Sequence, residues 1–107
     1  MKTSEFVASA RDEIYQGWTK NSYRNDQGVC ILGALDRVAM HNLHIDVEET
    51  VKARAKAEAE IKKMAKELFP DVWDGDIPAL NDRYDTTKED VLALLDKTTI
   101  GLEEKGE

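Results

Sequence analysis

The residue best suited to chemistry in this 107-residue chain is its single cysteine, Cys30. It follows the polar turn 25–27 and precedes the apolar run 31–32, so it is expected at the start of a helix. Backbone N–H groups at a helix N-terminus favour an anion, which lowers a thiol pKa and activates the sulfur as a nucleophile. An unpaired cysteine also packs well as a small buried residue. The apolar neighbours favour this second, structural interpretation.

A nucleophilic thiol needs a histidine to exchange its proton and a third group to orient the ring. His41 or His44 and then Asn81 or Asp82 follow Cys30 in the order that papain-like sites use. His41 is about three turns farther along the same helix, roughly 16 Å by helical rise, which is too far for a hydrogen bond. His44 would have to fold back from the following loop. We therefore predict no catalytic residue, and the chain is expected not to be an enzyme.

A second compact polar group is Asn81-Asp82-Arg83, just ahead of a capped helix. Asn and Asp commonly tie down loop backbone and an arginine pairs with a carboxylate, so a structural role is favoured. The alternative is a pocket shared with the loop at Gly17-Trp18, as in a small-molecule-binding protein or a hydrolase. Its candidate residues are Trp18, Cys30, Asn81, Asp82 and Arg83.

No metal or cofactor site is expected. Two histidines and one thiol do not make an ordinary structural zinc site, and one cysteine excludes an intrachain disulfide. The acidic run at Asp71, Asp74 and Asp76 lacks the ligand spacing and closing glutamate of a calcium loop. The chain has no Walker-type loop, no G-x-S-x-G and no H-E-x-x-H.

The charge balance limits the classes of partner. The chain has 22 acidic and 15 basic residues and a net charge of −7, which argues against binding to nucleic acid or to an anionic membrane. No apolar run approaches the roughly 20 residues of a membrane span, and the first residues lack the apolar core of a signal peptide. A reducing cytoplasm is the expected location.

Four segments have the apolar periodicity and the end signals of helices. They run from a cap at Thr3 or Ser4 to about Gln16, over 29–42, over 46–69, and from a capping box at Thr86 and Glu89 to about Gly101. Apolar residues surround most of the helix at 29–42, which predicts that it is the central helix. Loops 17–27 and 70–85 are expected to pack over it. The sequence thus predicts one all-α domain of four helices over 1–102, with a frayed charged tail at 103–107.

The long helix at 46–69 is a candidate interface. Asp46 and Glu49 suit its start and Pro70 ends it, but its middle, Ala53 to Ala59, has few large side chains. Such a surface buries little in a four-helix monomer and allows close approach of another helix, either from a second copy or from a host protein. The alternative is a solvent-exposed helix of high intrinsic propensity. The candidate interface residues within 50–66 are Val51, Arg54, Ala55, Glu58, Ala59 and Lys62.

Several short motifs occur together in order along residues 5–97. They are Gly17-Trp18, Cys30-x-x-Gly33-Ala34-Leu35, Ile77-Pro78-x-x-Asn81-Asp82, and the segment from Thr86 to Asp96. As a set they resemble an uncharacterised family, a domain of unknown function of actinobacteria and their bacteriophages. The resemblance implies a small intracellular helical protein encoded by a phage, and it supplies no catalytic residue. Together with the lack of an assembled catalytic set and the exposed faces expected for the helix at 46–69, this favours an accessory protein that binds a host protein.

Overall fold

Helices form most of the chain in the computed structural model, which describes residues 1–107. The elements in order are α1 (Thr3–Gln16), β1 (Arg24–Asn25), β2 (Gly28–Val29), α2 (Ile31–Asn42), α3 (Val47–Leu68), the 3-10 turn η1 (Trp73–Gly75), α4 (Ile77–Asp82) and α5 (Lys88–Glu104). The only sheet is the two-stranded antiparallel hairpin of β1 and β2, in which Arg24 pairs with Val29. The predicted all-α fold is confirmed. No helix is both long and apolar enough to cross a membrane.

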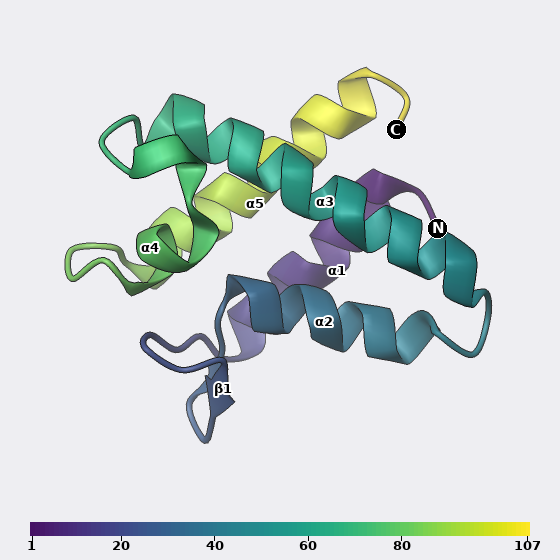
Figure 1. The fold of residues 1–107 in the computed structure, drawn as a ribbon, viewed down its shortest axis with the longest axis horizontal. Helices are drawn as coiled ribbons and strands as arrows, with labels where there is room; N and C mark the ends of the chain where they lie inside the picture. The colour runs from purple at the N-terminus through teal and green to yellow at the C-terminus, as the bar shows by residue number, and fades with distance from the viewer.

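The central helix is α1, not α2 as the sequence led us to expect. α1 packs against α2, α3 and α5, and its Phe6, Val7 and Ile14 are fully buried. Figure 1 shows α2 and α3 side by side, joined by a short turn, with α1 and α5 behind them. Met40 on α2 is 67% exposed, so the apolar residues around α2 do not all face the core.

Helix α1 begins at Thr3, which is one residue earlier than a cap at Thr3 would require and two earlier than a cap at Ser4 would require. Its N-cap is Lys2, whose backbone N–H donates to a Glu5 carboxylate oxygen at 2.7 Å. Thr3 and Ser4 are therefore inside the first turn, and Ser4 is buried. The physical reason is that Glu5, at the third helical position, accepts from the N–H of the N-cap residue. The helix can therefore begin after Lys2 without a hydroxyl side chain at the cap.

The start of α5 also differs from the predicted capping box by one residue. Thr87, not Thr86, is the N-cap, and its hydroxyl accepts from the Asp90 N–H at 3.1 Å. In return a carboxylate oxygen of Asp90 accepts from the Thr87 N–H at 2.9 Å. The sequence Thr86-Thr87 followed by Glu89-Asp90 allows two boxes in adjacent registers. The core decides between them, because Thr86 is buried while Thr87 is at the surface.

The expected frayed tail at 103–107 is instead held against the body. α5 continues to Glu104, with Leu102 buried in the core. The backbone carbonyl of Glu107 accepts from the Ser4 N–H at 3.2 Å. The Glu107 side chain also forms an ion pair with Lys56. The tail thus satisfies a free donor in the first turn of α1, which a sequence pattern does not reveal.

The long third helix is close to its predicted bounds, but the expected loop 70–85 contains more structure than predicted. α3 is capped by Asp46, whose side chain accepts from the Glu49 N–H, and it ends at Phe69. Within the loop, Asp76 caps α4 by accepting from the Ala79 N–H at 2.9 Å. An aspartate followed by a proline in the first turn is a helix start signal, so this fifth helix has a local cause.

Candidate functional site

Asn81, at the end of α4, joins three segments of the chain. Its buried side-chain oxygen accepts from the Trp18 indole Nε1–H at 2.9 Å and from the Ile31 backbone N–H at 3.2 Å. Its side-chain nitrogen donates to the Thr19 carbonyl at 3.0 Å and to a carboxylate oxygen of Asp82 at 2.9 Å. All four hydrogen-bonding capacities of the amide are therefore used inside the protein. Asn81 has the structural role that the sequence favoured, and it retains no free polar group for a ligand.

Two glycines let the loop after α1 lie close to the start of α2. Gly28 has a φ of 151°, and a Cβ there would lie 2.0 Å from the Gly17 carbonyl carbon. A Cβ on Gly33 would lie 2.5 Å from the Tyr23 carbonyl oxygen. The same Tyr23 carbonyl accepts from the Cys30 N–H at 3.0 Å. Because Gly33 has no side chain, the loop can pack against α2 at this point and form the hydrogen bond from Cys30 to Tyr23.

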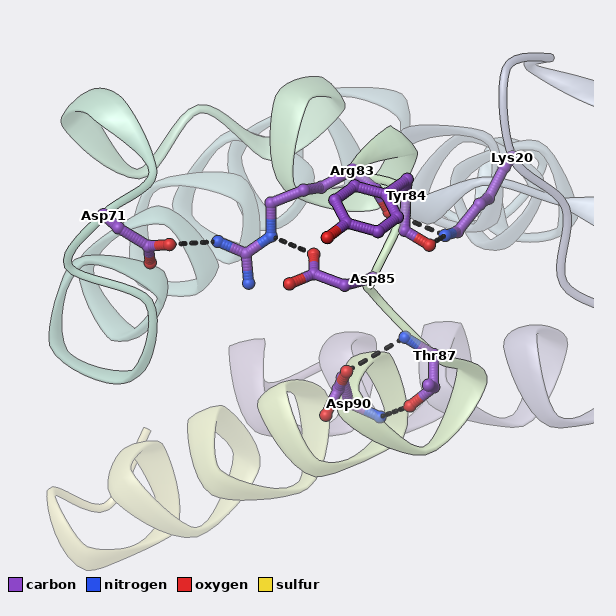
Figure 2. A network of polar contacts seen from close by, with 7 residues as sticks. All are labelled: Lys20, Asp71, Arg83, Tyr84, Asp85, Thr87 and Asp90. Carbon is purple, nitrogen blue, oxygen red and sulfur yellow. Dashed lines mark hydrogen bonds and ion pairs between the residues drawn. The ribbon is translucent and has the colours of Figure 1, made fainter.

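Two further residues fasten the loop to α4. A carboxylate oxygen of Asp82 accepts from the Asn21 backbone N–H at 2.8 Å, and Asn21 has a positive φ of 59°. The Lys20 ammonium donates to the carbonyls of Arg83 at 2.6 Å and Tyr84 at 3.0 Å (Figure 2). These carbonyls belong to the two residues that follow α4, so Lys20 holds the loop after α1 against the end of this helix. Sequence reasoning missed Lys20, because no local signal links residues so far apart.

Arg83 is an anchor at the surface of this region. Its guanidinium lies between Asp71 and Asp85, at 2.7 Å and 2.8 Å, as Figure 2 shows. The hydrogen bond from Arg83 holds the pKa of Asp71 below its ordinary value, and the same bond raises the pKa of Arg83. The guanidinium also lies 5.7 Å from the centroid of the Phe69 ring. Arg83 therefore joins the end of α3 to the segment before α5.

Cys30 is the N-cap of α2, and its sulfur accepts from the Gly33 N–H at 3.3 Å. The expectation of a helix start at this residue is confirmed. The expectation of a buried thiol is wrong, since Cys30 is only half-buried. The N-cap position explains the difference, because a capping side chain lies at the helix end rather than on its core face.

Cys30 lines an open pocket of about 300 Å³ between the loop after α1, the start of α2 and α4. The apolar part of its wall comes from Ile31, Leu32, Ile77 and Pro78. The other lining residues are Asn21, Ser22, Tyr23, Asn81 and Asp82. Sequence reasoning missed most of this wall, although the segment at 77–78 stood in one of the motifs.

The candidate pocket residues are only partly brought together. Cys30, Asn81 and Asp82 line the pocket, whereas Trp18 and Arg83 do not. Trp18 is packed on the core, and its indole N–H donates to the Asn81 side chain. Neither histidine lines this pocket, and no group of three or more His, Cys, Asp or Glu side chains is placed to hold a metal. The pocket therefore offers a thiol and a carboxylate beside an apolar wall.

The candidate interface on α3 has one buried and one outward face. The residues of the buried face are Thr50, Ala53, Ala57, Ile61 and Ala65. On the outward face Val51 is 57% exposed, and Ala55 and Ala59 are exposed as well. The alanines on the buried face thus pack in the core, and those on the outward face are exposed to solvent.

Three of the candidate interface residues, Arg54, Glu58 and Lys62, already have partners within the chain. Arg54 is ion-paired with Asp36 on α2 and, at 3.1 Å, with Glu58. Burial lowers the pKa of Arg54, but its hydrogen bonds to these two carboxylates outweigh that effect and raise it. Lys62 lies 3.1 Å from Asp74 in η1. Arg54 therefore links α3 to α2. Both basic and acidic side chains, Arg54, Lys62 and Glu58, lie beside the outward face of α3.

These features define a small, mostly helical domain with an open thiol-lined pocket and an unpartnered face on its longest helix. The sequence matches the model of a family of unknown function, DUF6197, over residues 1–99, and the chain belongs to that family. No curated protein and no solved structure matches it.

Proposed function

We propose that this protein acts without catalysis, as an accessory protein that binds another protein through the outward face of α3. The observation that carries the proposal is the exposed series Val51, Ala55 and Ala59 on a helix whose opposite face is packed in the core. Side chains four residues apart lie on one face of a helix, and small ones allow a second helix to approach closely. The occupant of this face is therefore a helix from another chain.

Nearby side chains add support for binding on this side of the molecule. Val47, one turn before Val51, is 59% exposed, and Ile45 in the preceding turn is 72% exposed. Contiguous exposed apolar side chains with a polar rim are typical of protein-binding surfaces. The rim here consists of Glu48 and Lys52, whose side chains are both largely exposed.

The setting of the proposed activity follows from the sequence resemblance. A chain of this kind encoded by a bacteriophage would act in the cytoplasm of its bacterial host, and the protein that it affects would be a host protein. The net charge of −7 fits a protein partner better than nucleic acid or an anionic membrane. The single thiol has no neighbouring histidine in its pocket, which favours binding over hydrolysis.

The test replaces the two outward alanines together, as Ala55→Glu with Ala59→Glu. Glutamate is a good helix former, so the fold is expected to persist, as circular dichroism can verify. The variant should lose both self-association, measured by sedimentation, and the capture of any host protein from lysate. Ala93→Glu is the matched control, because Ala93 is an exposed alanine on α5. Unchanged association in the double variant would overturn the proposal.

A second candidate function rests on the pocket beside Cys30. Its volume of about 300 Å³ is at the lower end of the range of ligand sites, and it combines an apolar wall with the Asp82 carboxylate. A small-molecule-binding protein would show saturable NMR shift changes confined to Ile31, Leu32 and Ile77 in a fragment screen. Hydrolysis would require turnover that Cys30→Ser abolishes. Shift changes scattered over the surface, without turnover, would exclude both forms of this candidate.

A further inference from the structure

The open pocket of about 300 Å³ between α2 and α4 has one charged side chain in its lining, the carboxylate of Asp82. No lysine, arginine or histidine lines this pocket. The apolar part of its wall is aliphatic and comes from Ile31, Leu32, Ile77 and Pro78. An apolar wall with a single charge beside it suits a ligand that has an apolar body and the opposite charge.

The Asp82 carboxylate is held in place by the chain but has no cationic partner there. One of its oxygens, Oδ1, accepts from the Asn21 backbone N–H at 2.8 Å and from the Asn81 side-chain nitrogen at 2.9 Å. The neighbouring Arg83 forms its ion pairs with two other aspartates. Asp82 is half-buried, and its second oxygen, Oδ2, accepts no hydrogen bond from the chain. That oxygen is free to accept from a ligand.

We infer that this pocket binds a small organic cation, a primary ammonium group carried on an apolar body. The inference rests on the second candidate function, the small-molecule pocket, and is independent of the proposed binding face on α3. The ammonium group donates to the free oxygen of Asp82, and the apolar body lies against Leu32 and Ile77. Hydrogen bonds between ionised groups are about twice as strong as those between neutral groups. Tyr23, which is 49% exposed, adds an aromatic ring to the lining, and such rings attract cations.

The first turn of α2 also borders the pocket, and the N-terminal end of a helix favours an anion. Two of its N–H groups already have acceptors within the chain. The Ile31 N–H donates to the Asn81 side chain at 3.2 Å, and the Gly33 N–H donates to the Cys30 sulfur at 3.3 Å. An anion in the pocket would also lie beside the Asp82 carboxylate. The lining as a whole therefore favours a cation.

NMR titrations with three ligands that share a benzyl group test the charge of the ligand. Phenethylamine is the cation, phenethyl alcohol is neutral and phenylacetate is the anion. In the unmodified chain phenethylamine should shift the methyl signals of Ile31, Leu32 and Ile77 in a saturable way. It should bind about tenfold more tightly than phenethyl alcohol, because only the amine makes a charge-assisted hydrogen bond. Phenylacetate should bind most weakly.

The variant Asp82→Asn removes the charge and keeps the shape of the side chain. Its side-chain oxygen can still accept from Asn21 and Asn81, so the fold should persist, as circular dichroism can verify. The Kd of phenethylamine should rise about tenfold while that of phenethyl alcohol stays unchanged. A merely structural role of Asp82 would weaken both ligands alike. Asp26→Asn is the matched control, because it removes an exposed carboxylate outside the pocket and should change neither Kd.

The outcomes separate this inference from the second candidate function. Equal binding of the amine and the alcohol, or tighter binding of phenylacetate, would overturn the cationic ligand and leave the pocket a small-molecule site. An unchanged Kd of phenethylamine in Asp82→Asn would do the same. Absence of saturable shifts with all three ligands would overturn both. The comparison of the three ligands uses the unmodified chain, so it decides the question even if Asp82→Asn does not fold.

Discussion

The Trp18 indole Nε1–H donates to the side-chain oxygen of Asn81 at 2.9 Å, across 63 positions of the chain. The same oxygen receives the backbone N–H of Ile31, the first residue of α2. One amide therefore holds the loop after α1, the start of α2 and the end of α4 in one arrangement, and through them it shapes the pocket beside Cys30.

This arrangement predicts a large effect of Asn81→Ala. The change leaves the Ile31 N–H and the Thr19 carbonyl without their buried partners, which should reduce the free energy of unfolding by about 3 kcal/mol. Trp18→Phe removes a single donor and should cost less, about 1 kcal/mol from the hydrogen bond itself. Urea titrations followed by circular dichroism measure both. Equal losses, or a smaller loss for Asn81→Ala, would contradict this role of Asn81.

The adjacent threonines before α5 should respond in opposite ways. Thr87→Ala removes the N-cap and should lower the free energy of unfolding by about 1 kcal/mol. Thr86→Val should be neutral or stabilising, because the Thr86 hydroxyl is buried and has no partner in the protein. Thermal unfolding of the two variants is a direct comparison. The reverse order would mean that α5 begins one residue earlier, as the sequence pattern suggested.

Cys30 should behave as an accessible helix cap. A serine is a preferred N-cap residue, so Cys30→Ser should change the free energy of unfolding by less than about 0.5 kcal/mol, whereas Cys30→Ala should cost about 1 kcal/mol. If the thiol were fully buried, Cys30→Ser would instead reduce the free energy of unfolding by a larger amount. The half-buried thiol should also react with a thiol reagent in the folded protein. Labelling that requires unfolding would show that the pocket beside Cys30 is closed in solution.

The pKa values of two carboxylates, Asp74 and Asp71, should respond differently when two lysines are removed. Hydrogen bonds from Lys66 and Lys62 hold the pKa of Asp74 below its ordinary value of 3.8. A carboxyl whose pKa is lower in the folded state contributes stability above its ordinary pKa, and that contribution is lost as the pH falls through the folded-state value. Lys62→Met with Lys66→Met should therefore raise the pKa of Asp74 toward 3.8 and make the loss of stability in acid less steep.

The measurement is an NMR titration of the carboxyl carbons in the two proteins. Asp71 is the internal control, because its pKa is lowered mainly by the hydrogen bond from Arg83 and should not move. An unchanged Asp74 would mean that the two lysines do not hold it in solution.

Much of the helical framework follows from local sequence. Pro70 ends the long helix because proline lacks the N–H and the space that a helix requires. Asp46 begins it because a short acidic side chain satisfies a free N–H of the first turn. These causes act within four or five residues, which is why α3 lies within one residue of its predicted bounds. The short α4 has equally local signals in Asp76 and Pro78, but the surrounding turn formers hid them.

Local sequence does not by itself decide which residue caps a helix or which helix is the most extensively packed. Thr86-Thr87 permits two caps, and only the packing of Thr86 into the core selects Thr87. The apolar residues of α2 suggested a central helix, yet α1 packs more extensively than α2 against the rest of the chain, above all against α5 and α2 itself. The apolar content of a helix indicates how much its burial would stabilise the fold. It does not indicate how closely the other helices will pack around it.

The sequence by itself determined the helical class and the approximate ends of the four longer helices, since composition and spacing within a few residues govern these. Only the tertiary structure decided that Cys30 lines an open pocket while Trp18 packs on the core outside it, and that Lys20 bonds to the carbonyls that follow α4. Those relationships join residues 50 or more positions apart. Contacts of that kind depend on how the helices pack together, and no periodicity within a single helix encodes them.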